Sequence, residues 1–151
     1  MKGSVHKAAL AGLLLASPVG AADLDQLFAG LDVCQFDFFY YDEPDRNPSH
    51  SFFSERGLKP YKERDGLYHF HVQEQLFGLP VVELVVPGTQ DFHMAVFDVP
   101  VAEAKPVLTA RFGIDFALSV PALAGEAPSL VADPRDPGRS FVYCVERQGG
   151  Y

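Results

Sequence analysis

The sequence predicts an α+β fold, in which an antiparallel sheet of about five to six strands has one or two helices packed on one face and its terminal strands linked by a disulfide. Two observations predict the sheet: several segments alternate apolar with polar residues, and short turns containing Gly or Pro join them. Two further segments have apolar residues at helical spacing. The disulfide is predicted from the two cysteines of the chain, Cys34 and Cys144.

The first 21 residues are predicted to be a signal peptide. Lys2 and Lys7 provide a basic start, an apolar run follows, and small residues precede a cleavage position after Ala21. The apolar run, Ala8 to Ala16, is about half the ~20 residues that a membrane-spanning helix needs, and no later segment is long and apolar enough. We therefore expect one α+β domain over residues 22–151, exported to the periplasm or secreted, with no membrane anchor.

The exported chain is strongly acidic. Cleavage after Ala21 removes Lys2 and Lys7 from the 12 basic residues, which leaves 10 against 20 acidic residues and a formal charge of −10. Such a surface repels nucleic acid and anionic membranes, so neither is expected as a partner. The acidity suits either solubility or a basic partner. Arg outnumbers Lys, and Ala, Gly and Pro are plentiful, a bias that favours a GC-rich bacterial genome and hence a periplasm.

Cys34 and Cys144 are separated by 110 positions. In an oxidising compartment such a pair forms a disulfide, and closing so long a loop stabilises a fold by roughly 4–5 kcal/mol if chain entropy dominates. Bridged Cα atoms lie about 4.4–6.8 Å apart, so the first and last strands would be close together. Two separate buried thiols are the alternative. The absence of a C-x-x-C motif argues against a redox role.

The first half of the chain predicts a helix, a strand and a long connection. Apolar residues at i, i+3, i+4 and i+7 from Leu24 predict a helix that Asp23 caps. The aromatic and β-branched segment Val33–Tyr41 predicts a strand whose cysteine-bearing face points to the core. Residues 42–66 form a polar connection, within which Ser51 can cap one or two helical turns.

The second half predicts five strands and one helix. The strands are Leu67–Phe77, Leu79–Val86, Phe92–Val99, Pro128–Asp133 and Arg139–Arg147, and the helix is Pro100–Phe112. Pro106 lies inside this helix, where it removes a backbone hydrogen bond unless the helix begins late.

Three histidines form a candidate site for zinc or copper. His69 and His71 share one face of the predicted strand Leu67–Phe77, about 7 Å apart, a spacing that can hold a metal. His93 lies early in a later strand, Phe92–Val99. The three converge only if the His93 strand lies beside the other strand, on the same face and at the same end. The alternative is a solvated polar face, which two glutamines continue.

Aromatic residues form a candidate surface for binding a protein. They gather in the first half of the chain, beside and within the polar connection of residues 42–66. Tyr and Phe next to a long acidic loop suit contact with another protein. Packing in the core is the alternative. The predicted surface residues are Phe39, Tyr41, Phe52, Phe53 and Tyr61.

The sequence contains no motif that identifies a reaction. It has no nucleophile elbow, phosphate-binding loop or dinucleotide-binding motif. The leading hypothesis is a non-enzymatic exported protein of the inhibitor, immunity or accessory type, which binds another protein and needs no cofactor. The alternatives are a metal-binding module that uses His69, His71 and His93, and a small hydrolase with an unrecognised site.

Overall fold

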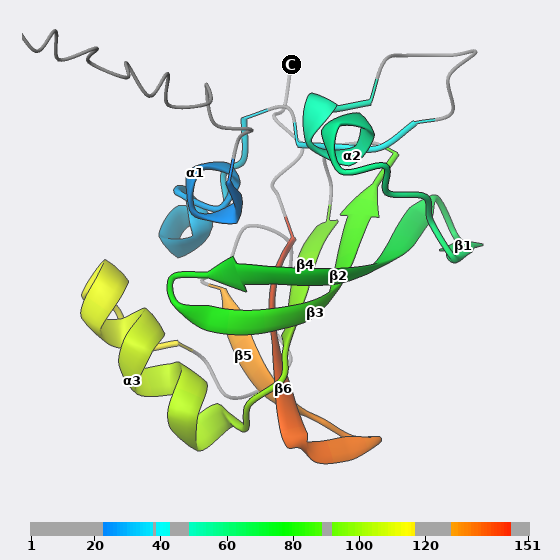
Figure 1. The fold of residues 1–151 in the computed structure, drawn as a ribbon. Helices are drawn as coiled ribbons and strands as arrows, with labels where there is room; N and C mark the ends of the chain where they lie inside the picture. Colours follow the sequence, from blue (N-terminus) through cyan, green and yellow to red (C-terminus); the bar gives the residue numbers. More distant parts are fainter. Residues whose placement is uncertain (1–22, 38, 43–48, 89–91, 117–127, 146–151) are drawn as a thin grey trace, which may run out of the picture.

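The strands form one six-stranded antiparallel sheet with the order β1-β2-β3-β4-β6-β5 (Figure 1). The computed structural model describes residues 23–37, 39–42, 49–88, 92–116 and 128–145. The strands are β1 (Lys62–Arg64), β2 (Leu67–Leu76), β3 (Leu79–Pro87), β4 (Phe92–Phe97), β5 (Ser129–Asp133) and β6 (Asp136–Val145). The helices are α1 (Leu24–Leu27), the 3-10 turn η1 (Leu31–Val33), α2 (Ser51–Glu55) and α3 (Val101–Phe112). The predicted α+β class with an antiparallel sheet is confirmed.

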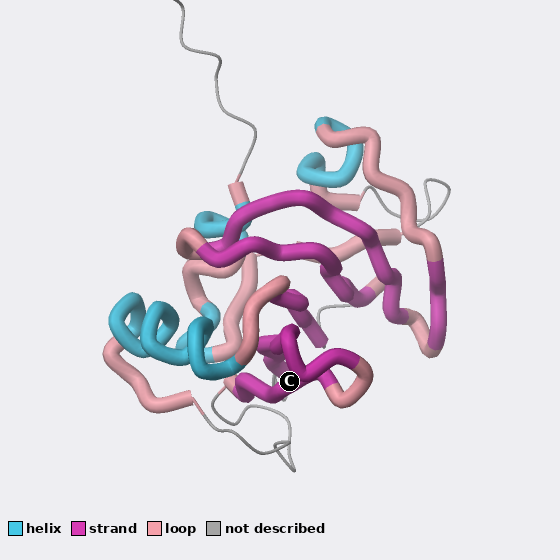
Figure 2. Tube along the Cα trace, turned by 60° about the horizontal axis from the view of Figure 1, so that its bottom comes forward, coloured by secondary structure: helices cyan, strands magenta, loops and turns pink. Residues whose placement is uncertain are grey.

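The sheet is strongly twisted, and three of its strand pairs are irregular. The register of β5 with β6 shifts between Ala132 and Asp133. The register of β2 with β3 shifts between His71 and Glu74, and the register of β3 with β4 shifts between Val81 and Glu83. Bulges of this kind increase the right-handed twist of a strand pair. As a result the long β2–β3 hairpin runs across β4, β6 and β5 (Figures 1 and 2).

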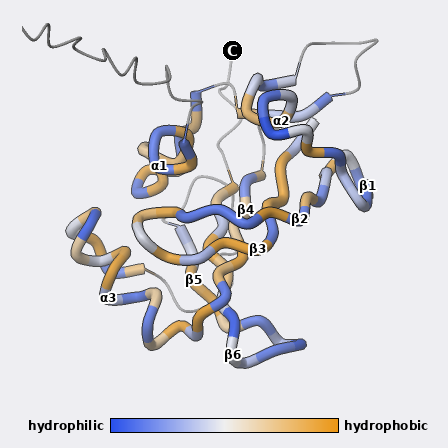
Figure 3. Tube along the Cα trace, in the orientation of Figure 1, coloured by the Kyte–Doolittle hydropathy of each residue, from blue (hydrophilic) through white to orange (hydrophobic). Residues whose placement is uncertain are grey.

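The helices pack on one face of the sheet, which we call the covered face. Residues of α1 to α3 and of the sheet form one buried cluster. The members from the helical segments and their caps are Leu24, Phe28, Leu31, Phe52, Phe53, Ala104 and Leu108. The members from the sheet include Phe70, Leu84, Ala95 and Val142, which form one row across β2, β3, β4 and β6. Hydrophilic residues gather instead near β1 and in the turn between β5 and β6 (Figure 3).

The helix ends follow local chemistry. Asp23 caps α1 as predicted, because its Oδ1 accepts from the N–H three residues later at 2.9 Å. The cap of α2 is His50, whose Nδ1 accepts from Phe52 N–H at 3.1 Å, and not Ser51 as predicted. The helix α3 runs unbroken through Pro106, at the cost of one backbone hydrogen bond.

The segment predicted as the first strand, Val33–Tyr41, does not form one in its described residues. It begins in a tight turn, where the carbonyl of Gly30 accepts two N–H groups and Cys34 adopts a left-handed φ of 51°. Gly30 is needed because a Cβ there would lie 2.0 Å from the carbonyl oxygen of Gln35. In the described part of this segment, only Tyr41 N–H makes a backbone hydrogen bond to the sheet, to β3 at 2.9 Å. The rings of Phe36, Phe39 and Tyr41 pack in the core of the covered face without extending the strand ladder.

Other predictions fall outside the described residues or are refined by the structure. The predicted signal peptide lies outside the described residues. The predicted connection of residues 42–66 contains α2 and the exposed edge strand β1. Of the helices in the described ranges, none has the length and apolar character needed to cross a membrane.

Cys34 and Cys144 form the predicted disulfide, with Cα atoms 5.3 Å apart. Both residues are buried, with exposed fractions of 3% and 1%. Cys144 lies in β6, whereas Cys34 follows η1 and is outside the sheet. The bridge therefore fastens the N-terminal turn, and not a first strand, to the last strand of the chain.

Loss of this disulfide should destabilise the protein. Substituting Cys34→Ala together with Cys144→Ala frees a loop of 110 residues, which we expect to lower the free energy of unfolding by roughly 4–5 kcal/mol. Guanidinium unfolding of the variant and of oxidised wild type measures the difference. Wild type in reductant, with two free thiols confirmed by mass, is the control. Equal midpoints for oxidised and reduced protein would contradict a structural role for the bridge.

Candidate functional site

The candidate site lies on the face of the sheet opposite the helices, which we call the open face. Antiparallel partners point to the same face, so the register defines two rows of side chains across it. The first row is His69, Val85, Met94, Tyr143 and Ser129. The second row is His71, Glu83, Val96, Phe141 and Val131. Within the described residues the helices belong to the buried cluster of the covered face, so none packs on these rows.

One end of the open face carries a group of polar side chains joined by hydrogen bonds. Glu83 Oε1 accepts from the Tyr61 hydroxyl at 2.8 Å and from His69 Nδ1 at 2.9 Å. The Tyr61 ring also stacks on His71, with 3.9 Å between ring centroids and 2° between planes. His71 and Glu83 are register partners on β2 and β3. These contacts hold four side chains in one arrangement, which we call the Tyr61 group.

The proton positions in the Tyr61 group follow from its chemistry. Burial, and then the hydrogen bond to Glu83, raise the pKa of Tyr61 to about 12, so its hydroxyl remains a donor at neutral pH. A carboxylate only accepts, so His69 presents Nδ1–H to Glu83, and Nε2 is the acceptor of the neutral ring. Such a pair can orient a general base or a metal ligand. Ser129 in the same row lies four strands away, or about 19 Å along the sheet, so it does not complete a hydrolytic triad.

The part of the open face on β4 and β6 is aromatic. The ring centroids of Phe141 and Tyr143 are 5.9 Å apart, and those of Phe92 and Tyr143 are 5.7 Å apart. Phe92, Met94 and Phe141 are half-buried, whereas Tyr143 is buried, which raises the pKa of its hydroxyl. Side chains of these types are enriched in protein–protein interfaces.

Arg135, in the turn between β5 and β6, places a fixed positive charge near the Tyr61 group. Its Nε and Nη2 each lie 3.1 Å from a carboxylate oxygen of Asp133, and its backbone N–H donates to the same carboxylate at 2.9 Å. These hydrogen bonds hold the pKa of Asp133 below its usual range. The Arg135 side chain is 76% exposed, and its charge acts on Glu83 and Tyr61.

The structure does not assemble the three predicted metal ligands. The strand β3 lies between β2 and β4, and the register places His93 on the covered face, opposite to His69 and His71. His93 is 1% exposed, donates from Nε2 to the carbonyl of Phe39, and packs its ring 4.3 Å from that of Phe36. Among the described residues, no three His, Cys, Asp or Glu side chains are grouped to hold a metal.

Three of the five aromatic residues predicted for a binding surface lie in the core. Phe39, Phe52 and Phe53 are at most 1% exposed, because they fill the space between α2 and the covered face. Tyr41 is half-buried against the same cluster. Tyr61 alone of the five is exposed, at 48%, and it belongs to the open face.

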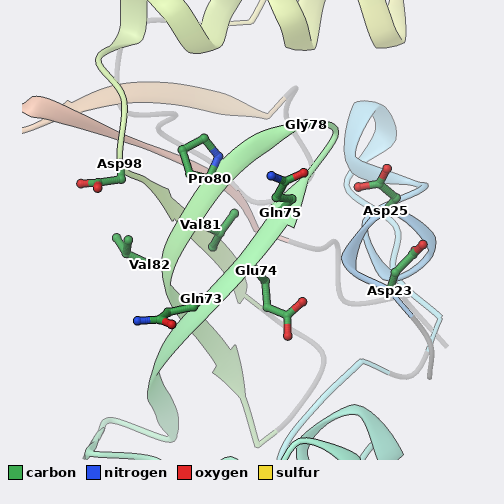
Figure 4. A pocket seen from close by; sticks show the side chains of 10 residues that line it. All are labelled: Asp23, Asp25, Gln73, Glu74, Gln75, Gly78, Pro80, Val81, Val82 and Asp98. Atoms are coloured by element: carbon green, nitrogen blue, oxygen red, sulfur yellow. The ribbon is translucent and has the colours of Figure 1, made fainter. Parts of the chain in front are cut away.

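A pocket of about 740 Å³ opens at the end of the β2–β3 hairpin that faces α1 (Figure 4). Its acidic lining has a structural explanation, because each carboxylate already has a partner. The partners are the first turn of α1 for Asp23, Phe77 N–H for Asp25, Arg56 for Glu74 and Arg139 for Asp98. In Figure 4 Asp23 and Asp25 lie on one side of the hairpin and Asp98 on the other, so the carboxylates do not converge.

Sequence reasoning missed most of the open face, although one signal was present. In the predicted strand Arg139–Arg147, Phe141 and Tyr143 alternate with Cys144 and so lie on the face opposite to it. That alternation already implies a sheet face carrying two aromatic rings. Nothing in the sequence indicates that Arg135 lies near them. No family model, curated protein or solved structure matches this chain, so the geometry of the open face is the basis for assigning a function.

The hydrogen bond between Tyr61 and Glu83 should stabilise the fold measurably. In a double-mutant cycle with Tyr61→Phe and Glu83→Gln, we expect a coupling energy of about 1 kcal/mol, because the acceptor is charged but the donor is half exposed. Urea unfolding of the four proteins measures it. Tyr41→Phe replaces Tyr61→Phe in the control cycle and should show no coupling with Glu83. Additive effects of Tyr61→Phe and Glu83→Gln would mean that the hydrogen bond does not form in solution.

Burial of His93 should make the fold sensitive to acid. Burial lowers the pKa of His93 from 6.5 to about 4, so on acidification the unfolded chain takes up the proton first. The contribution of His93 is complete above pH 6.5 and falls by about 3 kcal/mol as the pH drops to 4. His93→Gln keeps a donor for the carbonyl of Phe39 and does not titrate, so its stability should fall less over this range. Parallel curves of unfolding free energy against pH for the two proteins would refute this role.

Proposed function

We propose that this protein is an exported, non-enzymatic binding protein of the inhibitor, immunity or accessory type, and that it contacts another protein through the open face. The observation that carries the proposal is the composition of this face. A sheet with helices on one side ordinarily presents polar residues on the other. Here the side opposite the helices instead carries apolar residues, of which Phe92, Met94, Phe141 and the stacked Tyr61 are half-buried or exposed. Other members of this side are buried, namely Val85, Val96, Ser129 and Tyr143.

Two features of the open face support protein binding. It combines aromatic residues, Met and Arg, which are enriched in protein interfaces. The Tyr61 group and Arg135 are already held by hydrogen bonds, so a partner would order few additional side chains.

The buried disulfide and the acidic composition support export. A bridge between Cys34 and Cys144 forms and persists in oxidising compartments. The full chain has a formal net charge of −8, which suits a protein that stays soluble while it presents an apolar contact surface.

Site-specific photo-crosslinking tests the proposed surface. A photoreactive phenylalanine at position 141 should join the oxidised protein to one discrete partner in native periplasmic extract. The same group in place of Val107, which is exposed on α3, is the control and should give no such product. Phe141→Arg should abolish co-purification of the partner, while its melting temperature stays close to that of wild type. The surface assignment fails if position 107 yields the same product or if position 141 yields none.

A further inference from the structure

The short helix α2 depends on the residue that precedes it. It has five residues, far fewer than the ~12–15 at which an isolated helix becomes even marginally stable in water. Its first N–H groups bond to His50: Phe52 N–H donates to the ring Nδ1 at 3.1 Å, and Phe53 N–H donates to the backbone carbonyl at 3.3 Å. His50 N–H in turn donates to the carbonyl of Tyr40 at 3.1 Å. The helix therefore begins from a residue that is itself fixed to the core segment of residues 39–42.

A histidine cap differs from the usual caps because its acceptor can be lost. Ser, Thr, Asp and Asn, which ordinarily cap helices, keep an acceptor oxygen whatever the pH. A neutral imidazole accepts at one nitrogen, whereas the protonated ring has two donors and no acceptor. Protonation of His50 therefore breaks its hydrogen bond with Phe52 N–H, whichever way the ring turns. It also places a positive charge at a helix N-terminus, where the helix dipole disfavours it.

The surroundings of the His50 ring favour its neutral form. The ring meets Phe39 edge-on, with 5.7 Å between centroids. Burial lowers the pKa of His50 below the ordinary value of 6.5, and the nearby carboxylate of Glu55 offsets this effect only in part. A base whose pKa is lower in the closed state stabilises that state above pH 6.5, and this contribution is lost as the pH falls.

The other titratable groups packed around this site are engaged with partners of their own. Arg56 at the end of α2 pairs with Glu74 of β2 at 2.7 Å. His93 of β4 stacks on the ring of Phe39 and donates to the carbonyl of the same residue. His50 is therefore the histidine whose protonation acts directly on the start of α2.

We propose that His50 is a pH-sensitive cap, and that its protonation loosens α2 from the covered face while the sheet stays folded. Loss of one typical side-chain cap should increase the population of opened α2 about fivefold. Opening exposes Phe52 and Phe53, which are at most 1% exposed in the closed state. The sheet does not open with α2, because its strand ladders and the Cys34–Cys144 bridge do not include that helix. Acid thereby creates an apolar surface opposite the open face, whether or not the open face binds a protein.

Hydrogen exchange followed by NMR measures the opening at single amides. From about pH 7.5 to about pH 5, the protection factors of the Phe53 and Leu58 amides, corrected for intrinsic exchange, should fall about fivefold. His50→Asn keeps a capping acceptor that does not titrate, so it should abolish this change at α2. His71→Asn removes an exposed histidine of β2 and is the matched control, which should retain the fivefold change.

His93→Gln distinguishes opening of α2 from acid destabilisation of the whole fold. This variant should reduce the acid sensitivity of the sheet amides and leave that of the α2 amides unchanged. His50→Asn should do the reverse. Equal loss of α2 protection in wild type and His50→Asn would overturn the proposal, and so would α2 amides whose protection does not depend on pH.

The ring of His50 can also be observed directly in the wild-type protein. In protein labelled with 15N-histidine, His50 should carry its proton on Nε2 at about pH 7.5, with Nδ1 unprotonated, and should titrate below pH 6.5. An Nδ1–H tautomer at neutral pH, or a titration midpoint at or above 6.5, would overturn the proposal even if the His50→Asn variant failed to fold.

Discussion

The packing of the N-terminal segment against β6 is the constraint on which the rest of the structure depends. The Cys34–Cys144 bridge fixes this segment to a strand that has a neighbour on each side, β4 and β5. Next to the bridge, Phe39 and Phe36 pack on His93, whose Nε2–H satisfies the carbonyl of Phe39. A backbone carbonyl buried among rings is costly without a donor, so the imidazole is a structural residue of the core.

The packing of the N-terminal segment against β6 determines which face of the sheet the helices cover. Once the N-terminal segment lies on the covered face, α2 follows it there, and Phe39 stacks on Phe53 at 5.6 Å between ring centroids. The helix α3 adds Ala104 and Leu108 to the same cluster. All the described helices therefore pack on the covered face of the sheet. On the other side, Tyr143 lies between Phe92 and Phe141, with ring centroids 5.7 and 5.9 Å apart.

The sequence predicts the parts of the fold that local patterns specify. Strict alternation locates β2, a run of aromatic and β-branched residues locates β6, and an Asp before an apolar stripe locates α1, because these patterns concern neighbours in the chain. The Val33–Tyr41 segment has the same aromatic content as a strand, but whether it pairs depends on the turn at Gly30 and on room beside β3. The three charged residues of β1 carry no pattern at all. These features depend on contacts between segments that are distant in sequence.

The face on which His93 lies also depends on contacts between distant segments and could not be predicted from local sequence. In β4 the residues His93, Ala95 and Phe97 alternate with Phe92, Met94 and Val96, so both sets are apolar enough to face a core. Alternation cannot choose between them. The choice follows from the register of β4 with β6, where His93 lies opposite the bridged Cys144. The sequence therefore predicts correctly that His93 lies in a strand. Its place in the core follows from its position opposite the bridged Cys144.

The architecture of the open face also bears on the size of its partner. Small ligands bind in concave sites that enclose most of their surface, whereas the two rows of the open face cross five strands, or about 19 Å at 4.8 Å per strand. The Tyr61 group lies at the β1–β3 end of those rows, and the aromatic residues lie on the next strands, β4 and β6. A protein surface can contact both groups at once, since a standard interface covers about 800 Å² on each partner. The breadth of these rows would therefore suit the protein partner proposed above, with the Tyr61 group setting its orientation and the aromatic residues contributing most of the apolar burial.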